Sequence, residues 1–445
     1  MKRKTFALLF LLSVWGVTSY AQISKRTALL TDVLDIDTTT DEGKRALMLY
    51  SKIGQVGITG YIQPQFQYAG SKGAQGWAGG NFADNSNNRF LLRRGRLRID
   101  FAHFTADGKP EMNFVFQFDG TERGMAIRDL WGRYYENKWE LFHFSAGMMA
   151  RPFSYELLLP SADRESPERG RMSQILMNTE RDLGFMISLN PRKKKSRLKW
   201  LNIDAGIYNG QGLTGTAEMD AHKDIVGRIS VKPRKIGNAG YLSAGISGYT
   251  GGIESRSDVV YIPEKTSIGW QMRYDSAAAN KGKLIPRKYA GADAQFIIPN
   301  RKGVTQLRAE YMSGLQTATA ATSVTPGTYP VNASGANLPL YKRNFNGAYF
   351  YFLQHLGSTR HQLVLKYDWY DPNSKVKGKQ LTTANGFTAA DIKYNTFGAG
   401  YIYYLNQYLK VVLYYDRVMN EKTALDGYET DLKDDVFTAR VQFSF

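Results

Sequence analysis

The sequence contains no cysteine among its 445 residues. This absence excludes a disulfide framework, a thiolate metal site and a cysteine nucleophile. Histidine is also scarce, and the five histidines show none of the short spacings that metal sites use. The sequence therefore gives no indication of metal or thiol chemistry, and we expect no cofactor.

Long hydrophobic runs are missing as well, except near the start of the chain. Lys2, Arg3 and Lys4 precede an apolar stretch, and Ser19-Tyr20-Ala21 offers a cleavage site with small residues. This pattern predicts a secretory signal peptide over residues 1–21, because the apolar stretch is too short to span a membrane. No later stretch approaches the roughly 18 apolar residues of a transmembrane helix. We expect residues 22–54 to form a short periplasmic N-terminal extension.

Strand-like segments with alternating side chains fill the rest of the chain. The last one, DVFTARVQFSF, places aromatic and aliphatic residues on one face and polar residues on the other. In a transmembrane β-barrel the lipid-facing and lumen-facing residues alternate, so a mean hydropathy of −0.39 is compatible with a membrane protein. A final phenylalanine in this phase, Phe445, resembles the assembly signal of bacterial outer-membrane barrels. The sequence thus predicts an all-β, antiparallel transmembrane barrel over residues 55–445 in the Gram-negative outer membrane.

The number of strands follows from the connections between them. Seventeen segments are strand candidates, whereas bacterial single-chain barrels have an even number of strands with short periplasmic turns and long outer loops. When the connections are assigned as inner turns or outer loops from each end of the chain, the two assignments disagree around residues 251–286. Assigning TSIGWQMRYDS to a hairpin inside one outer loop removes the conflict. We therefore expect a wall of 16 strands.

Residues 89–100, RFLLRRGRLRID, combine five arginines with the pattern of a strand. Arg94, Arg96 and Arg98 share one face, which we assign to the lumen because a charge facing lipid costs about 2–4 kcal/mol at mid-membrane. The three side chains would form a ladder roughly 13 Å long on the pore wall. The same alternation places Arg93 on the outer face, at a subunit contact or near the outer boundary.

The connection over residues 150–181 is unusually long for a barrel loop, and such loops are either functional or disordered. Leu157–Leu159 and Ile175–Met177 give it apolar anchors, so we expect it to fold into the barrel and narrow the lumen. Arginines at a constriction select anions, because guanidinium forms bidentate hydrogen bonds with phosphate oxygens. The alternative is a surface loop with scattered charges. The candidate anion-binding residues of the loop are Arg151, Arg164, Arg169 and Arg171.

Six motifs, in this order along the chain, resemble those of a known family: RRGRLRID, GMMARPFSYE, ERDLG, YNGQG, KDIVGRIS and DDVFTARVQFSF. Together they are similar to the phosphate-selective porins of the O and P type, in a form typical of a Bacteroidetes-like branch. The resemblance implies a homotrimeric channel of 16 strands with an inward-folded third outer loop. It also implies that an arginine ladder passes phosphate or pyrophosphate, with Arg94, Arg96 and Arg98 matching the ladder by position.

The charges on the expected lumen face are nearly balanced. The basic side chains there are Arg94, Arg96, Arg98, Arg133, Arg228, Lys232, Arg308, Lys366, Lys410 and Arg440. The acidic ones are Asp100, Asp119, Asp129, Asp204, Asp293, Glu310, Asp368 and Asp416. We expect a passive channel for small anions, phosphate above all. Two alternatives stay open: a general or weakly selective porin, and a non-conducting barrel that binds or adheres to a partner.

An enzymatic function is the remaining class. His143 and Ser145 lie two residues apart on one strand face, as a base and a nucleophile could. However, Phe142 and Phe144 take the lipid side, so the pair is expected to point into the lumen, away from any lipid substrate. We therefore expect no enzyme and no catalytic residue.

Overall fold

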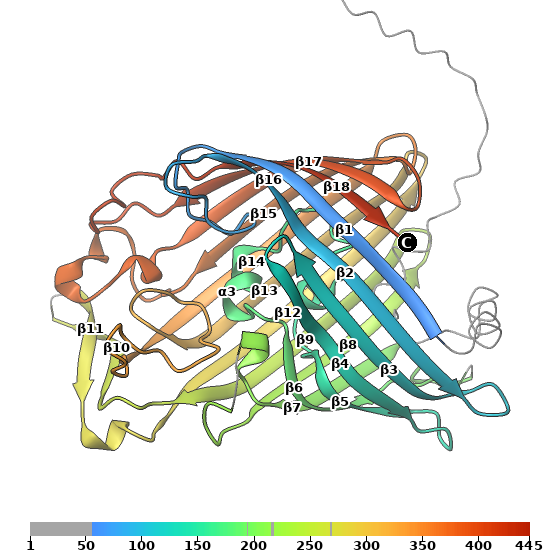
Figure 1. Ribbon diagram of the computed structural model, residues 1–445, viewed down its shortest axis with the longest axis horizontal. Helices are drawn as coiled ribbons and strands as arrows, with labels where there is room; N and C mark the ends of the chain where they lie inside the picture. The colour runs from blue at the N-terminus through green and yellow to red at the C-terminus, as the bar shows by residue number, and fades with distance from the viewer. Residues whose placement is uncertain (1–55, 194, 215–217, 268) are drawn as a thin grey trace, which may run out of the picture.

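The computed structural model describes residues 56–445, except 194, 215–217 and 268. The predicted signal peptide (1–21) and N-terminal extension (22–54) lie outside the described residues. The strands form one antiparallel sheet that closes on itself as a tilted barrel (Figure 1). The closure is made by β1 and β18, which pair antiparallel with Phe66 opposite Ala439.

Sixteen strands make the wall, as predicted. The first nine are β1 (Val56–Ala69), β2 (Asn88–Phe104), β3 (Pro110–Thr121), β4 (Gly124–Tyr135), β5 (Phe142–Ala150), β6 (Arg181–Leu189), β7 (Leu201–Tyr208), β8 (Asp224–Ile236) and β9 (Gly240–Glu254). The other seven are β12 (Leu284–Asn300), β13 (Gly303–Ala318), β14 (Leu340–His355), β15 (His361–Asp371), β16 (Tyr394–Tyr404), β17 (Leu409–Asn420) and β18 (Val436–Ser444).

The remaining two strands, β10 (Val259–Thr266) and β11 (Gly269–Ser276), form a hairpin outside the wall. The wall is continuous without them, because β9 pairs directly with β12. Figure 1 shows the hairpin at one end of the barrel. The assignment of TSIGWQMRYDS to a hairpin in an outer loop is therefore confirmed. The sequence pattern had missed β10, whose Pro263-Glu264-Lys265 interrupts the alternation and suits a strand outside the barrel wall.

Short and long connections alternate as expected. One end of the barrel has short turns, such as 237–239, 301–302 and 405–408. The opposite end carries long connections, including 319–339 and 372–393. Short periplasmic turns and long outer loops are the arrangement of outer-membrane barrels. The long-loop end is therefore the outer end.

Side chains alternate across the wall, as β18 illustrates. Phe437 and Phe443 are exposed on the outside, whereas Thr438, Arg440 and Gln442 are buried on the inside. Such an apolar outer band with a polar interior is required of a barrel in hydrocarbon. The barrel is thus of the kind found in the Gram-negative outer membrane. Among the described residues, no helix has the length and hydrophobicity required to cross a membrane.

The predicted outward position of Arg93 is wrong, and a β-bulge is the reason. The register between β1 and β2 shifts between Ile62 and Pro64, so that Gln63 faces both Arg93 and Arg94. Two residues opposite one change the direction of the bulged strand's side chains. As a result Arg93 turns inward and makes an ion pair with Glu168 inside the barrel.

Candidate functional site: the lumen beside the inward-folded loop

The connection between β5 and β6 enters the lumen, which confirms the predicted constriction loop. Two short helices, α2 (Tyr155–Leu158) and α3 (Arg171–Leu176), lie in it, and α3 is visible inside the barrel in Figure 1. We call residues 151–180 the constriction loop. Its side chains and carbonyls contact strands on several sides of the lumen, so the loop crosses the interior rather than lying at the rim.

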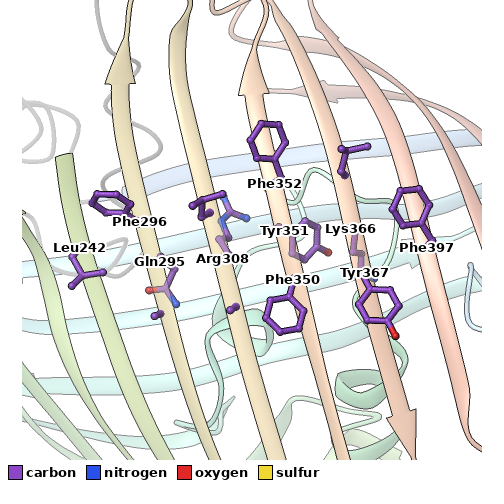
Figure 2. A pocket seen from close by; sticks show the side chains of 14 residues that line it. Leu242, Gln295, Phe296, Arg308, Phe350, Tyr351, Phe352, Lys366, Tyr367 and Phe397 are labelled. Carbon is purple, nitrogen blue, oxygen red and sulfur yellow. The ribbon is translucent and has the colours of Figure 1, made fainter. Parts of the chain in front are cut away.

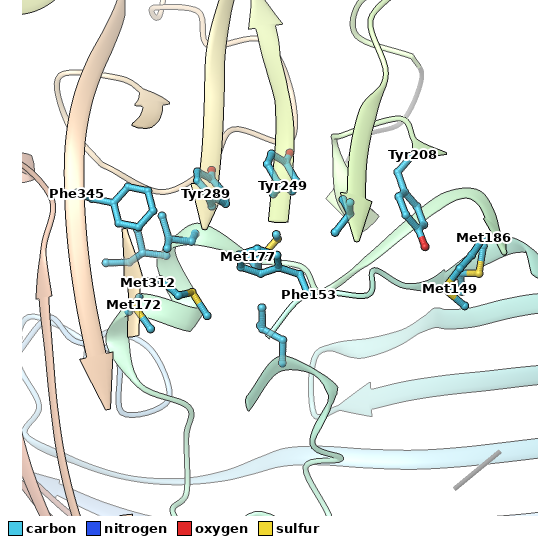
Figure 3. Close-up of a cluster of buried hydrophobic side chains, with 14 of the residues drawn as sticks. Met149, Phe153, Met172, Met177, Met186, Tyr208, Tyr249, Tyr289, Met312 and Phe345 are labelled. Atoms are coloured by element: carbon cyan, nitrogen blue, oxygen red, sulfur yellow. The ribbon is translucent and has the colours of Figure 1, made fainter. Parts of the chain in front are cut away.

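Apolar packing holds one side of the constriction loop. Phe153, Leu157 and Leu176 are buried among side chains of the inner wall. Figure 3 shows Phe153 and Met177 beside the rings of Tyr249 and Tyr289, which come from β9 and β12. Full burial of one such side chain contributes about 1.5–3 kcal/mol. The apolar anchors expected from the sequence therefore fix the loop to this part of the wall.

Ion pairs hold the other side of the constriction loop. The carboxylate of Glu168 contacts three guanidinium groups of the wall: Arg93 at 2.8 Å, Arg94 at 2.7 Å and Arg440 at 3.1 Å. Arg308 on β13 adds a pair with Glu165 at 2.7 Å. Truncating one partner of a buried ion pair typically costs about 3–5 kcal/mol, because it leaves an uncompensated charge. These contacts therefore fix the loop's position on this side of the lumen.

The three arginines of the predicted ladder have different surroundings in the structure. Arg94 and Arg96 both hold the constriction loop: Arg94 contacts Glu168, and Arg96 donates to Ser161 Oγ at 2.6 Å. Arg96 also pairs with Asp119 of β3 at 3.0 Å. Arg98 is clear of these contacts with the loop's polar residues, and its guanidinium pairs with Asp100 at 2.7 Å. Arg98 is thus the member of the ladder that borders open space.

That open space is a cavity of about 240 Å³ between the constriction loop and the wall formed by β2 and β4–β8. The loop contributes Pro152, Tyr155 and Leu158–Pro160 to its lining. The basic residues that line it are Arg98, Arg133, Arg181, Arg228 and Lys232, and the acidic ones are Asp129 and Asp204. The cavity lining is therefore predominantly basic.

Arg133 lines the cavity without a close carboxylate partner among the described residues. Its Nε donates to Ser145 Oγ at 2.9 Å, and its guanidinium lies 5.0 Å from the ring centre of Trp131. Within the described part of the chain, no carboxylate lies within 4.0 Å of it. His143 and Ser145 point into the lumen as predicted, with exposures of 4% and 1%. Ser145 here positions a guanidinium by accepting its hydrogen bond.

The other predicted arginines lie in or against the constriction loop and are mostly paired. Arg151 lies 3.6 Å from Asp182, and Arg169 pairs with Glu180 at 3.1 Å. Arg171 stacks over the ring of Tyr394 at 3.6 Å. These contacts make the three arginines part of the framework of the loop. They are not brought together into one anion-binding cluster.

Arg164 and Arg228 have contrasting surroundings. Two guanidinium nitrogens of Arg164, Nε and Nη1, are buried without a hydrogen-bond partner in the described structure. Arg228 instead pairs with Asp293 at 2.5 Å and donates to Ser247. Arg228 borders the cavity, whereas Arg164 is enclosed by the loop and wall arginines.

Two almost fully buried ion pairs are among those that were missed from the sequence. Arg287 pairs with Asp224, and Arg343 pairs with Asp391, at 3.0 and 2.8 Å, and all four side chains are almost fully buried. Arg287 and Asp293 lie an even number of residues apart on β12 and therefore face the same side, so the alternation of the strand could have placed Arg287 in the lumen. Arg343 lies one residue before the expected start of its strand, and its partner belongs to an outer loop. No sequence signal links these two segments.

Comparisons with known proteins show the fold. No family model matches the chain, and no curated protein matches it in sequence. OprB of Pseudomonas putida is similar in structure, with a TM-score of 0.55, 11% identity, and coverage of 92% of this chain and 98% of that chain. The outer membrane channel DcaP of Acinetobacter baumannii gives a TM-score of 0.50 and 12% identity, over 88% of this chain and 97% of that chain. The chain thus shares the barrel fold of outer-membrane proteins.

Proposed function

We propose that this barrel is a passive outer-membrane channel for small anions, with phosphate as the foremost substrate. The observation that carries the proposal is the basic cavity beside the constriction loop. The pairs of Glu165 and Glu168 occupy the side of the lumen near β2, β13 and β18, so the cavity against β4–β8 is the space left for a permeating ion. An anion passing there meets Arg98, Arg133 and Arg228.

The electrostatics of this passage favour anions. A cleft lined by charge of one sign with low-dielectric walls concentrates counter-ions and raises their rate of entry. Arg133 is the strongest candidate for direct contact, because its guanidinium has no carboxylate partner within 4.0 Å in the described residues. Guanidinium matches the geometry of phosphate oxygens in bidentate hydrogen bonds. The resemblance to phosphate-selective porins supports the same substrate.

Planar-bilayer recording tests the proposal. With a potassium chloride gradient, the wild-type channel should give a reversal potential of the sign expected for anion preference. Arg133→Glu should lower the chloride-to-potassium permeability ratio several-fold. Lys302→Glu, which makes the same charge change in the exposed turn between β12 and β13, should leave the ratio near its wild-type value. An unchanged ratio in Arg133→Glu would overturn the assignment of the passage.

A weakly selective porin is the second candidate, and the ion pairing in the lining favours it. Arg98, Arg181 and Arg228 each contact a carboxylate, of Asp100, Asp129 and Asp293 respectively. Phosphate titrated against the chloride current separates the two functions. Saturable inhibition indicates a phosphate site, and purely additive currents indicate general diffusion. A barrel without single-channel conductance would instead be a binding or adhesive protein.

We further propose a homotrimer, on the strength of the resemblance to phosphate-selective porins. Mass determination of the detergent-solubilised protein by light scattering tests this. A particle of three chains is expected, and a monodisperse single barrel would contradict the proposal.

A further inference from the structure

A hollow on the outer face of the barrel is not used by the channel. It has a volume of about 460 Å³ and lies over β9 and β12–β16. Its floor includes Ala294 and Ala309, which lie opposite each other on β12 and β13, and Ala244 of β9 lies opposite Ala294 on the other side. Rings of Phe296, Phe350, Phe352 and Phe397 project from the same outer face around this floor (Figure 2).

The hollow continues along β12 as a furrow. Ala290, Ala292 and Ala294 are successive outward residues of this strand, and the row ends toward the outer rim at Lys288. Taller side chains border it: Ile246 on β9 and Tyr311 on β13 are 57% and 48% exposed. Ala292 thus lies between two taller neighbours, whereas Ala290 lies opposite Gly248 and Ser313, so the furrow is a shallow depression that widens toward Ala290.

The position of Lys288 fits the depth of one membrane leaflet. Six residues of strand separate Lys288 from Ala294, which is about 20 Å along the strand. With strands tilted by about 35–45°, this is roughly 15 Å along the membrane normal, close to half of the ~25 Å apolar band. This separation matches a hollow near mid-membrane with the ammonium group at the level of the lipid headgroups.

Lys288 lacks a protein counter-ion. In the described structure, no hydrogen bond or ion pair to its Nζ is found, and the same holds for Lys342, an outward residue at the outer end of β14. By contrast Arg417, outward on β17, is paired with Asp431 and Asp435. The charge at the head of the furrow thus complements an anionic headgroup.

We propose that this furrow is a binding site for one acyl chain of a phosphate-bearing outer-leaflet lipid. The chain lies along Ala290–Ala294 with its end in the hollow, and the headgroup phosphate contacts Lys288. A second copy of the barrel fits less well, because a lipid phosphate supplies the counter-ion that Lys288 lacks in the described structure, whereas the exposed outer wall of a barrel is mainly apolar. The side chains that would contact the acyl chain, such as Ala292, Ala294 and Phe350, face away from the lumen, although the wall residues Arg308 and Lys366 also border the hollow.

The test is the amount of phosphorylated lipid that stays bound after mild detergent extraction and gel filtration. The probe is the native membrane's own lipid, measured as lipid phosphate and acyl chains per barrel. Wild-type protein should retain lipid in near-stoichiometric amount. Ala294→Phe, which fills the hollow, should lose most of it, and Lys288→Glu should lose the phosphorylated lipid selectively.

Ala439→Phe is the matched control, because Ala439 is an outward alanine on β18, away from the furrow. It should retain lipid like the wild type. Single-channel conductance identifies variants that assemble, so a folding failure is recognised separately; Ala309→Phe then replaces Ala294→Phe as a second way to fill the hollow. Equal retention in the filled and control variants would overturn the proposal. A change of oligomeric state without lipid loss would also overturn it and would assign the furrow to a subunit interface.

Discussion

Arg94 and Glu168 lie 2.7 Å apart and join the barrel wall to the loop that narrows it. The two residues are far apart in the chain, on β2 and in the constriction loop. Their contact is buried on both sides, with side-chain exposures of 8% and 6%. Arg94, the first arginine of the ladder, therefore holds the constriction loop in place and does not face open solvent. Mutations at this contact should change the position of the loop.

Glu168→Gln should loosen the constriction loop. The change leaves Arg93, Arg94 and Arg440 without their shared carboxylate, and removing one partner of a buried ion pair costs about 3–5 kcal/mol. We expect noisier single-channel currents and faster proteolysis within residues 151–180. Glu264→Gln, which removes an exposed pair with Arg273, serves as the control. Quiet, wild-type currents in Glu168→Gln would show that the apolar contacts alone hold the loop.

Charge reversal at Arg96 and at Arg98 should have different effects. Arg98→Glu acts at the edge of the cavity and should reduce anion selectivity several-fold with little change in current noise. Arg96→Glu also removes the hydrogen bond to Ser161 and the pair with Asp119, so its selectivity loss should be accompanied by loop fluctuations. Reversal potentials and noise spectra, measured on the same channels, separate the two. Identical behaviour would contradict the division of the ladder.

Deleting Phe445 should reduce the amount of assembled barrel in the membrane. The backbone of Phe445 completes the seam between β18 and β1: its N–H donates to Gly60 O at 2.9 Å, and its carbonyl accepts from Gly60 N at 3.2 Å. Its ring covers Gly60, where a Cβ would lie 2.4 Å from the ring. The heat-modifiable gel shift of outer-membrane fractions measures assembly. Phe443→Ala, a lipid-facing change on the same strand, should assemble better than the deletion.

Removing the β10–β11 hairpin should leave the barrel intact. β9 and β12 already pair over most of their length, from Leu284 opposite Glu254 to Ile297 opposite Tyr241. A variant in which a short Gly-Ser linker replaces residues 257–279 should therefore assemble and conduct. Loss of the heat-modifiable form would mean that the hairpin is needed to build the wall.

Much of the architecture could be predicted from local pattern. The alternation of side chains in β18 showed which residues face the lumen and which face lipid. The lengths of the connections showed how many strands form the wall. The bulge at Arg93 was not predictable in this way: alternation places Arg93 on the lipid side, which is a misfit, but the position of the shift is defined only by the partner strand. β10 was missed because its Pro263-Glu264-Lys265 does not look like a strand.

The candidate site was predictable as a region but not as a set of contacts. The lumen positions of Arg98, Arg133 and Arg228 could be predicted, because the alternation of side chains along a strand determines which face each residue takes. Which arginines remain near open space depends on the carboxylates of the constriction loop, such as Glu165 and Glu168. These are brought to their partners only by the path of the loop, and sequence spacing does not encode that path.

The two attachments of the constriction loop respond to different perturbations. Contacts such as Leu176 with Tyr289 and Phe345 weaken on cooling, because burial of apolar surface loses strength at low temperature. The pairs of Glu165 and Glu168 with Arg308 and Arg94 are buried, and dissolved salt screens buried pairs much less than exposed ones. Cooling therefore loosens the apolar attachment of the loop, while its ion-paired attachment persists even in concentrated electrolyte, so the loop pivots about the ion-paired side when the channel is cold.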